Sequence, residues 1–82
     1  MYHVYILKCG DGTLYTGVTT DLKRRLAEHK QGTGAKYTRA RGVAKCIYSE
    51  TARNRSAAQK REAEIKSWRR EQKLALIKIA KK

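Results

Sequence analysis

The alternation of apolar and polar residues along the chain predicts three strands. Residues 2 to 9 are rich in tyrosine and β-branched side chains, and residues 13 to 18 repeat this pattern. The Gly-Asp-Gly stretch between them, residues 10 to 12, is typical of a hairpin turn. A third strand is expected over residues 43 to 50. The first two strands should therefore pair as an antiparallel hairpin.

Helical spacing begins directly after the hairpin. Thr20 or Asp21 can cap a helix that runs to about Lys30. Within this helix, Arg24 and Glu28 lie four residues apart and are expected to form an ion pair. A basic, glycine-rich loop then separates the first helix from the third strand.

The last third of the chain predicts two further helices. Ser56 and Gln59 have the spacing of a capping box before a helix over about 57 to 71. A last helix, which can be continuous with it, covers about 72 to 80. The order is then ββαβαα. Three antiparallel strands flanked by helices form a small α+β domain, and we expect one such domain over residues 1 to 82.

Length and composition restrict the class of protein. The 82 residues are near the lower limit for a domain with a single hydrophobic core. No apolar run approaches the roughly 18 residues that a membrane span needs, and the N-terminus lacks the features of a signal peptide. Cys9 and Cys46 lack the spacing of metal ligands and are expected to be buried thiols. These observations favour a cytoplasmic protein without a membrane partner.

The charge of the chain changes this picture most. Twenty lysines and arginines against seven acidic residues give a net charge of +13. Such an excess favours a polyanionic partner, with nucleic acid as the first candidate because neutralised phosphates release counterions. Two alternatives remain open. The C-terminal segment KLALIKIAKK partly fits a membrane-surface helix, and small ribosomal proteins share this charge.

Two polar residues share the apolar side of the first helix. Leu22 and Leu26 define the buried stripe, and Arg25 and His29 fall on or beside it. An arginine on an inward face is unusual unless another group meets its charge. Arg25 is therefore either a snorkelling side chain at the edge of the stripe or a functional cation. For His29 the alternatives are a structural histidine and a catalytic one.

A carboxylate occupies the corresponding position on the second helix. Ala58, Ile65 and Trp68 mark its inner face, and Glu62 lies on the same stripe. One interpretation is that Glu62 pairs with a nearby basic side chain. The other is that it holds a hard cation, which takes oxygen ligands and keeps most of its waters.

The length of the hairpin loop decides whether two tyrosines share a face. A two-residue loop would pair Lys8 with Tyr15 and place Tyr5 on the opposite face. A three-residue loop pairs Leu7 with Tyr15 and Tyr5 with Gly17, which leaves space beside Tyr5. The residues alone allow both arrangements. We predict the three-residue loop, with both hydroxyls on the sheet face that carries the arginine of the first helix.

These residues, in this order, resemble the GIY-YIG nuclease domain. The resemblance rests on Val4-Tyr5-Ile6, Tyr15-Thr16-Gly17, Arg25, His29 and Glu62. It covers nearly the whole chain, and the ββαβαα order matches the small fold of that family. The stretch from Val4 to His29 looks most like the short bacterial members, which consist of little more than this domain.

The resemblance implies catalytic roles. Tyr5 and Tyr15 correspond to the tyrosines of the two family triplets. Arg25 corresponds to the catalytic arginine and Glu62 to the metal-binding glutamate, and His29 matches a histidine that some members carry. Hydrolysis of a phosphodiester needs an activated water and charge stabilisation at the phosphoryl oxygens. Tyr5, Tyr15 or His29 would accept the proton, since neighbouring cations favour a phenolate.

Four departures from the family pattern bear on substrate range and rate. His3 replaces the glycine of the first triplet, and Thr16 replaces the isoleucine of the second. Val18 stands where some repair members carry a lysine, and no asparagine follows Glu62. The set of candidate catalytic residues is nevertheless complete.

The resemblance implies an endonuclease that requires Mg²⁺ or Mn²⁺ and hydrolyses DNA in repair or recombination, as a cytoplasmic monomer. Recognition of DNA structure is expected, because no second domain is present to read a long sequence. The side chains expected to contact nucleic acid are Arg24, Lys36, Tyr37, Arg39 and Arg41. RNA remains open as a substrate. The alternatives are a binding module with weak or lost activity and a ribosome-associated protein.

Overall fold

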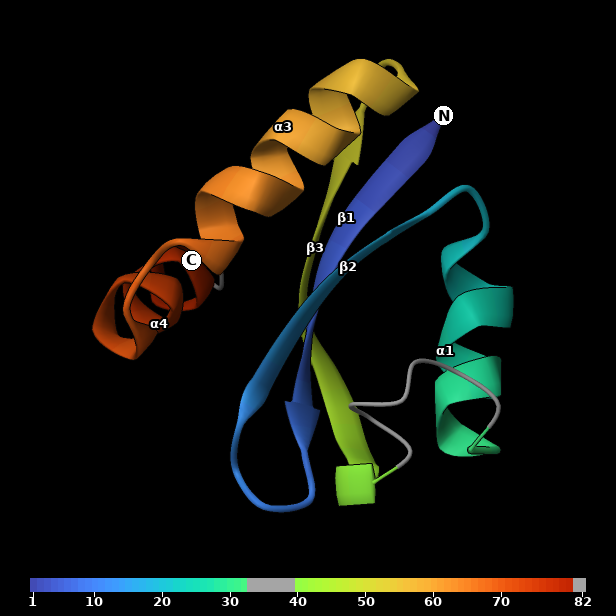
Figure 1. Ribbon diagram of the computed structural model, residues 1–82, viewed down its shortest axis with the longest axis vertical. Coiled ribbons are helices and arrows are strands. Elements are labelled where there is room, and N and C mark those ends of the chain that lie inside the picture. Colours follow the sequence, from blue (N-terminus) through green and yellow to red (C-terminus); the bar gives the residue numbers. More distant parts are fainter. Residues whose placement is uncertain (33–39, 81–82) are drawn as a thin grey trace.

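The computed structural model describes residues 1–32 and 40–80, which follow the predicted ββαβαα order (Figure 1). The strands are β1 (Tyr2–Cys9), β2 (Leu14–Thr19) and β3 (Val43–Ala52), and the helices are α1 (Leu22–Lys30), α3 (Arg55–Lys66) and α4 (Arg70–Ala80). The strands pair antiparallel in the order β2-β1-β3, so β1 is central and β2 lies at an edge. The α+β prediction is confirmed.

The helices lie on opposite sides of the sheet (Figure 1). Helices α3 and α4 cover one face, where the core consists of Val4, Ile6, Ala58, Ile65 and Ile77. Helix α1 covers the other face, toward which the alternate residues of β1 point. Each face of β1 is therefore buried against a different helical layer.

The hairpin has the predicted three-residue loop. Leu7 pairs with Tyr15, and Tyr5 pairs with Gly17. The amide of Gly12 donates to the carbonyl of Cys9 at 3.0 Å, and Gly12 has a φ of 86°. A left-handed residue closing a three-residue loop is a common hairpin geometry, and glycine adopts it without strain.

Two helix boundaries differ from the prediction. Helix α3 is capped by Asn54, whose Oδ1 accepts from the Ala57 amide at 2.8 Å, rather than by the Ser56 capping box. Asparagine is as good an N-cap residue as serine, and Asn54 precedes Ser56 along the chain. The helix therefore begins at Arg55, and Ser56 lies inside it instead of at the capping position. At the N-terminus of α1, Asp21 is the cap, accepting from the Arg24 amide at 3.0 Å.

The second difference is a break where one long helix to residue 71 was expected. Helix α3 ends at Lys66, and the Ser67 hydroxyl donates to the Glu64 carbonyl at 2.7 Å. Helix α4 then restarts, with the Gln72 side chain accepting from the Arg69 amide at 2.9 Å. Side-chain hydrogen bonds thus satisfy backbone groups on both sides of the break. Among the described helices, none combines the length and apolar content that a membrane crossing needs.

Candidate active site

Three aromatic rings meet on the α1 face of the sheet. The hydroxyl oxygen of Tyr5 lies 2.9 Å from Nε2 of His29, and these side chains form a buried hydrogen bond. The ring of Tyr15 lies 6.5 Å from that of Tyr5 and 5.5 Å from that of His29, measured between centroids. The predicted sharing of one face by the two tyrosines is therefore confirmed, and the histidine of α1 joins them.

Gly17 allows Tyr5 to reach the edge of the sheet. A Cβ atom at position 17 would lie 2.5 Å from the Tyr5 hydroxyl, 2.6 Å from its Cζ, and 3.1 Å from a ring carbon of Tyr15. The two separations below 3.0 Å are essentially never seen for real Cβ atoms. The Tyr5 ring thus extends from the central strand β1 over β2, because Gly17 beneath it has no side chain.

Arg25 extends from α1 toward the same group. Its Nη1 donates to Oε1 of Glu28 at 3.0 Å, and it also hydrogen-bonds with Tyr5. The observed ion pair of Glu28 is thus with Arg25, three residues earlier, where the sequence suggested Arg24. With its side chain 31% exposed, Arg25 lies at the boundary between the aromatic group and solvent.

Burial controls the protonation of this group. Burial raises the pKa of Tyr5, and the opposing hydrogen bond with Arg25 does not cancel it. Burial and the nearby Arg25 charge lower the pKa of His29. Tyr5 therefore keeps its proton near neutral pH while His29 is uncharged. The expectation that neighbouring cations favour a phenolate does not hold for Tyr5, because desolvation outweighs them.

Glu62 approaches from the opposite side of the sheet, on α3. Its Oε2 lies 3.4 Å from Nζ of Lys66, and its side chain is 26% exposed. The Lys66 ammonium also lies 6.0 Å from the centre of the Tyr15 ring. Sequence reasoning missed Lys66, although its position four residues after Glu62 on one helix face was the signal that could have identified it.

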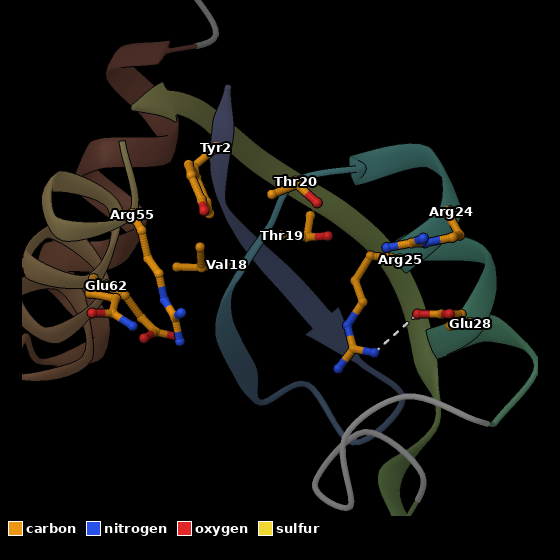
Figure 2. Close-up of a pocket in the computed structure, with 10 residues that line it drawn as sticks. Tyr2, Val18, Thr19, Thr20, Arg24, Arg25, Glu28, Arg55 and Glu62 are labelled. Atoms are coloured by element: carbon orange, nitrogen blue, oxygen red, sulfur yellow. Dashed lines mark hydrogen bonds and ion pairs between the residues drawn. The ribbon is translucent and has the colours of Figure 1, made fainter. Parts of the chain in front are cut away.

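An open cleft joins the two helical layers at the edge of the sheet. It has a volume of about 540 Å³ and runs between α1 and α3 over the end of β2. Figure 2 shows Arg25 and Glu28 on one wall, Arg55 and Glu62 on the other, and Val18 between them. Arg25 and Glu62 belong to opposite faces of the sheet, and they reach the same cleft because β2 is an edge strand.

The donor set fits a hydrated divalent ion that binds together with substrate. Within residues 1–32 and 40–80, no group of three or more His, Cys, Asp and Glu side chains could hold a metal by itself. Two carboxylates line the open cleft, and Glu28 is paired with Arg25, which leaves Glu62 of α3 as the candidate ligand. Mg²⁺ commonly keeps several waters and binds through one or two carboxylates and the phosphates of its substrate. Glu62 suits such an ion.

The predicted nucleic-acid contacts separate into three groups. Arg24 is exposed and lines the cleft (Figure 2). Arg41 instead pairs with Asp11 of the hairpin loop at 3.2 Å, and it is not among the residues that line the cleft. Lys36, Tyr37 and Arg39 lie outside the residues that the structure describes.

Residues 1–75 match the family described as the GIY-YIG catalytic domain. A UPF0213 protein of Halobacterium salinarum is 51% identical over 77 residues, which are 94% of this chain and 100% of the relative. A UPF0213 protein of Streptococcus agalactiae is 53% identical over 76 residues, which are 93% of this chain and 86% of the relative. The family match spans the range of the chain in which Tyr5, Tyr15, Arg25, His29 and Glu62 lie.

Two solved structures are similar to this chain in fold and in sequence. The solution NMR structure of a UPF0213 protein from Bacillus halodurans is 41% identical, with a TM-score of 0.62, and the match covers 96% of this chain and 85% of that one. A solution NMR structure of a protein from E. faecalis is 46% identical, with a TM-score of 0.64, covering 95% and 83%. These similarities confirm the fold and the expected resemblance to short family members.

Proposed function

Because this chain belongs to the GIY-YIG family, we propose that it is a divalent-metal-dependent nuclease that hydrolyses phosphodiester bonds of DNA. The observation that supports this most directly is the arrangement at the edge of β2. Tyr5, Tyr15 and His29 lie together on the α1 face of the sheet. Arg25, which interacts with Tyr5, lines the same cleft as Glu62 of α3. A protein that only bound phosphates would have no reason to direct a carboxylate into a basic cleft.

In the proposed reaction, Arg25 binds the non-bridging oxygens of the phosphate that is cut. Its guanidinium is planar and can donate two parallel hydrogen bonds to such oxygens. This places a fixed positive charge where negative charge develops in the transition state. Glu28, which pairs with Arg25 at 3.0 Å, orients the guanidinium before substrate arrives.

In the proposed reaction, the Tyr5–His29 pair accepts the proton that the attacking water releases. Tyr5 is protonated near neutral pH, so its hydroxyl can accept a proton from water only as it passes its own proton on. Nε2 of His29, uncharged and 2.9 Å away, is positioned to receive it. Glu62 would hold the divalent ion, which when bound supplies charge stabilisation at the phosphate and the leaving oxygen. Tyr15 packs against both rings and limits their movement.

We propose that the substrate is recognised by its structure, consistent with roles in DNA repair or recombination. The net charge of +13 favours binding to any nucleic acid through its phosphates. The cleft offers arginines and short polar side chains at the edge of β2, which suit phosphates rather than a long set of base edges. Selection would then depend on which DNA forms can enter the cleft.

One observation favours a second candidate, a nucleic-acid-binding module without activity. The carboxylate of Glu62 already has a partner in Lys66 at 3.4 Å. If that pair is purely structural, the chain would bind nucleic acid by charge and would not cut it. The role of the Glu62 carboxylate therefore distinguishes the nuclease from the binding module.

The test is the substitution Glu62→Gln, with Glu64→Gln as the matched control. Glu64 lies on the same helix with its side chain 54% exposed, and it pairs with Arg61 outside the cleft. We expect Glu62→Gln to lower the Mg²⁺-dependent cleavage rate by about 10³-fold or more, as the loss of several kcal/mol of transition-state stabilisation implies. The control should cut at the parental rate. Both rates are measured on a panel of labelled single-stranded, nicked, branched and duplex DNA.

Binding and stability are measured on the same preparations. DNA affinity of Glu62→Gln should be equal or higher, because a negative charge beside the phosphates has gone. Its melting temperature should change little, since a partly exposed pair such as Glu62–Lys66 contributes about 0–1 kcal/mol. A Glu62→Gln protein that cuts at the parental rate would contradict the assignment of Glu62 to the divalent ion. A parental protein that binds these DNA forms and cuts none of them would establish the binding module instead.

A further inference from the structure

Helix α3 presents a polar stripe to the cleft that extends well beyond Glu62. Arg55, Gln59 and Glu62 all line the cleft, and Lys66 continues the stripe one turn later. Their spacing of four, three and four residues places them on one face of the helix. The stripe is about 16 Å long, from the 1.5 Å rise of each residue. It is therefore longer than a single phosphate needs.

Arg55 stands at one end of this stripe. Its side chain points along the cleft wall toward Glu62 in Figure 2. In the part of the chain that the structure describes, Arg55 forms no ion pair and its side chain makes no hydrogen bond. Arg61 of the same helix is different, because it pairs with Glu50 and Glu64 and lies over the ring of Trp68. The guanidinium of Arg61 therefore has a structural role, whereas that of Arg55 remains available to a ligand.

Lys66 stands at the other end. Its ammonium lies 3.4 Å from Glu62 and 6.0 Å from the centre of the Tyr15 ring, and its side chain is 51% exposed. An ammonium on a flexible stem can turn to a phosphate once a cation takes its place beside the carboxylate. Lys66 is thus positioned on the opposite side of Glu62 from Arg55.

We propose that Arg55 and Lys66 bind the phosphates that flank the bond to be cut, so that one unpaired strand lies along α3 across the active site. This inference rests on the proposed nuclease function and adds the form of the substrate. Both residues are positioning residues for the strand, and the reaction itself is left to the groups around Tyr5, Arg25 and Glu62.

The dimensions of the cleft favour one strand over two. Its volume of about 540 Å³ is that of a site for a small molecule, which is comparable to one or two nucleotides. The major groove of a duplex alone is about 12 Å wide, so a cleft of this volume cannot enclose an intact duplex. The facing wall carries Arg24 and Arg25, so a strand in the cleft would have cations on both sides.

The experiment uses the full chain with Glu62→Gln as background, which removes both cleavage and the Lys66 pairing partner. Arg55→Gln and Lys66→Gln are compared with Lys60→Gln, an exposed lysine on the opposite side of α3 from Glu62. The affinity for a fluorescent single-stranded oligonucleotide and for a blunt duplex is measured over a range of salt concentrations. Melting temperatures verify that all proteins are folded.

Each stripe substitution should reduce the slope of log affinity against log salt for the single strand by about 0.7, the value for one phosphate contact. Lys60→Gln should leave the slope unchanged, and the blunt duplex should show no larger loss with the stripe variants than with this control. Equal slopes for all three variants, or equal losses on duplex and single strand, would overturn the inference and leave the nuclease proposal intact. Absence of any DNA binding by the background protein would instead contradict the proposed function.

Discussion

The two faces of the central strand β1 are buried to the same extent but are built from different chemistry. Ile6 is 0% exposed and Tyr5 is 1% exposed, although they are neighbours in the chain. Ile6 belongs to an apolar cluster beneath α3 and α4, whereas the Tyr5 hydroxyl bonds to His29 beneath α1. Burial alone thus does not distinguish a structural residue from a candidate catalytic one. The partner of each side chain does.

Because of this difference, we expect the two faces to contribute differently to stability and to activity. An apolar face gains free energy in proportion to the area that it removes from water. A polar face must supply a hydrogen-bond partner for every buried donor and acceptor, because each unsatisfied group destabilises the fold by its desolvation free energy. We therefore expect substitutions on the α1 face to affect activity more than stability. Three predictions test this division, beginning with the largest expected effect.

The first prediction compares two tyrosine hydroxyls, one on each face. Tyr5→Phe removes the bond to His29, and Tyr48→Phe removes the 2.6 Å bond to Glu50 on the α3 face. Each change should reduce the free energy of unfolding by about 1 kcal/mol, the net contribution of a hydrogen bond. Only Tyr5→Phe should lower the cleavage rate, by about 10²- to 10⁴-fold, as expected for a lost proton-transfer group.

The measurements are urea unfolding and single-turnover cleavage at saturating DNA. Equal cleavage by the two variants would show that the hydroxyl on the α1 face has only a structural role. A large loss with Tyr48→Phe would show that the division between the faces is wrong.

The second prediction concerns a polar group on the apolar face. Thr16 is 2% exposed, and its hydroxyl has no hydrogen-bond partner among the described residues. Thr16→Val keeps the shape and removes the unsatisfied group, so we expect the free energy of unfolding to rise by about 1 kcal/mol. For a domain of this size the melting temperature should increase by about 4–8 °C, measured by calorimetry.

Thr19→Val is the matched control for the second prediction. Thr19 is similarly buried, but its hydroxyl accepts from the Asp21 amide at 3.1 Å. This substitution should lower the melting temperature, because it leaves the Asp21 amide without that acceptor. A decrease with Thr16→Val as well would mean that the Thr16 hydroxyl is satisfied in solution.

The smallest expected effect is a pH dependence that belongs to the α1 face. The pKa of His29 is lowered from its ordinary value of 6.5, so between the two values the unfolded chain binds more protons than the folded one. The free energy of unfolding should therefore fall as the pH falls below about 6.5. His29→Gln should remove this part of the slope, measured by urea unfolding from pH 5 to 8. Identical slopes for the two proteins would show that His29 is not the group responsible.

The hairpin could be predicted because its causes are local, whereas its register was a choice between the two loop lengths that the residues allow. The Gly10-Asp11-Gly12 loop determines which residues pair, and alternation then determines the face of Tyr5 and Tyr15. The break after Lys66 could not be predicted in the same way. It depends on one hydrogen bond that the Ser67 hydroxyl donates and one that the Gln72 side chain accepts, and neither glycine nor proline marks it.

The candidate site was only partly accessible from the sequence. Helical spacing indicated Arg25 and Glu62 as unusual residues, but it could not show that two helices on opposite faces share a cleft. That depends on the strand order, which places β2 at the edge. Lys66 was missed because it is one of twenty basic residues, so its spacing of four residues from Glu62 did not stand out until its distances to Glu62 and Tyr15 were known.

The distribution of the candidate catalytic residues has a consequence for biosynthesis. Tyr5, Tyr15, Arg25 and His29 all belong to the contiguous unit formed by the hairpin and α1, whereas Glu62 arrives only with α3. During translation the emerging segment would therefore carry its cations before the carboxylate of α3 is in place. On the proposed function, a nascent or partly folded chain is harmless to the nucleic acid that surrounds it. Cutting would require α3 to dock on the sheet, so activity is coupled to completion of the fold.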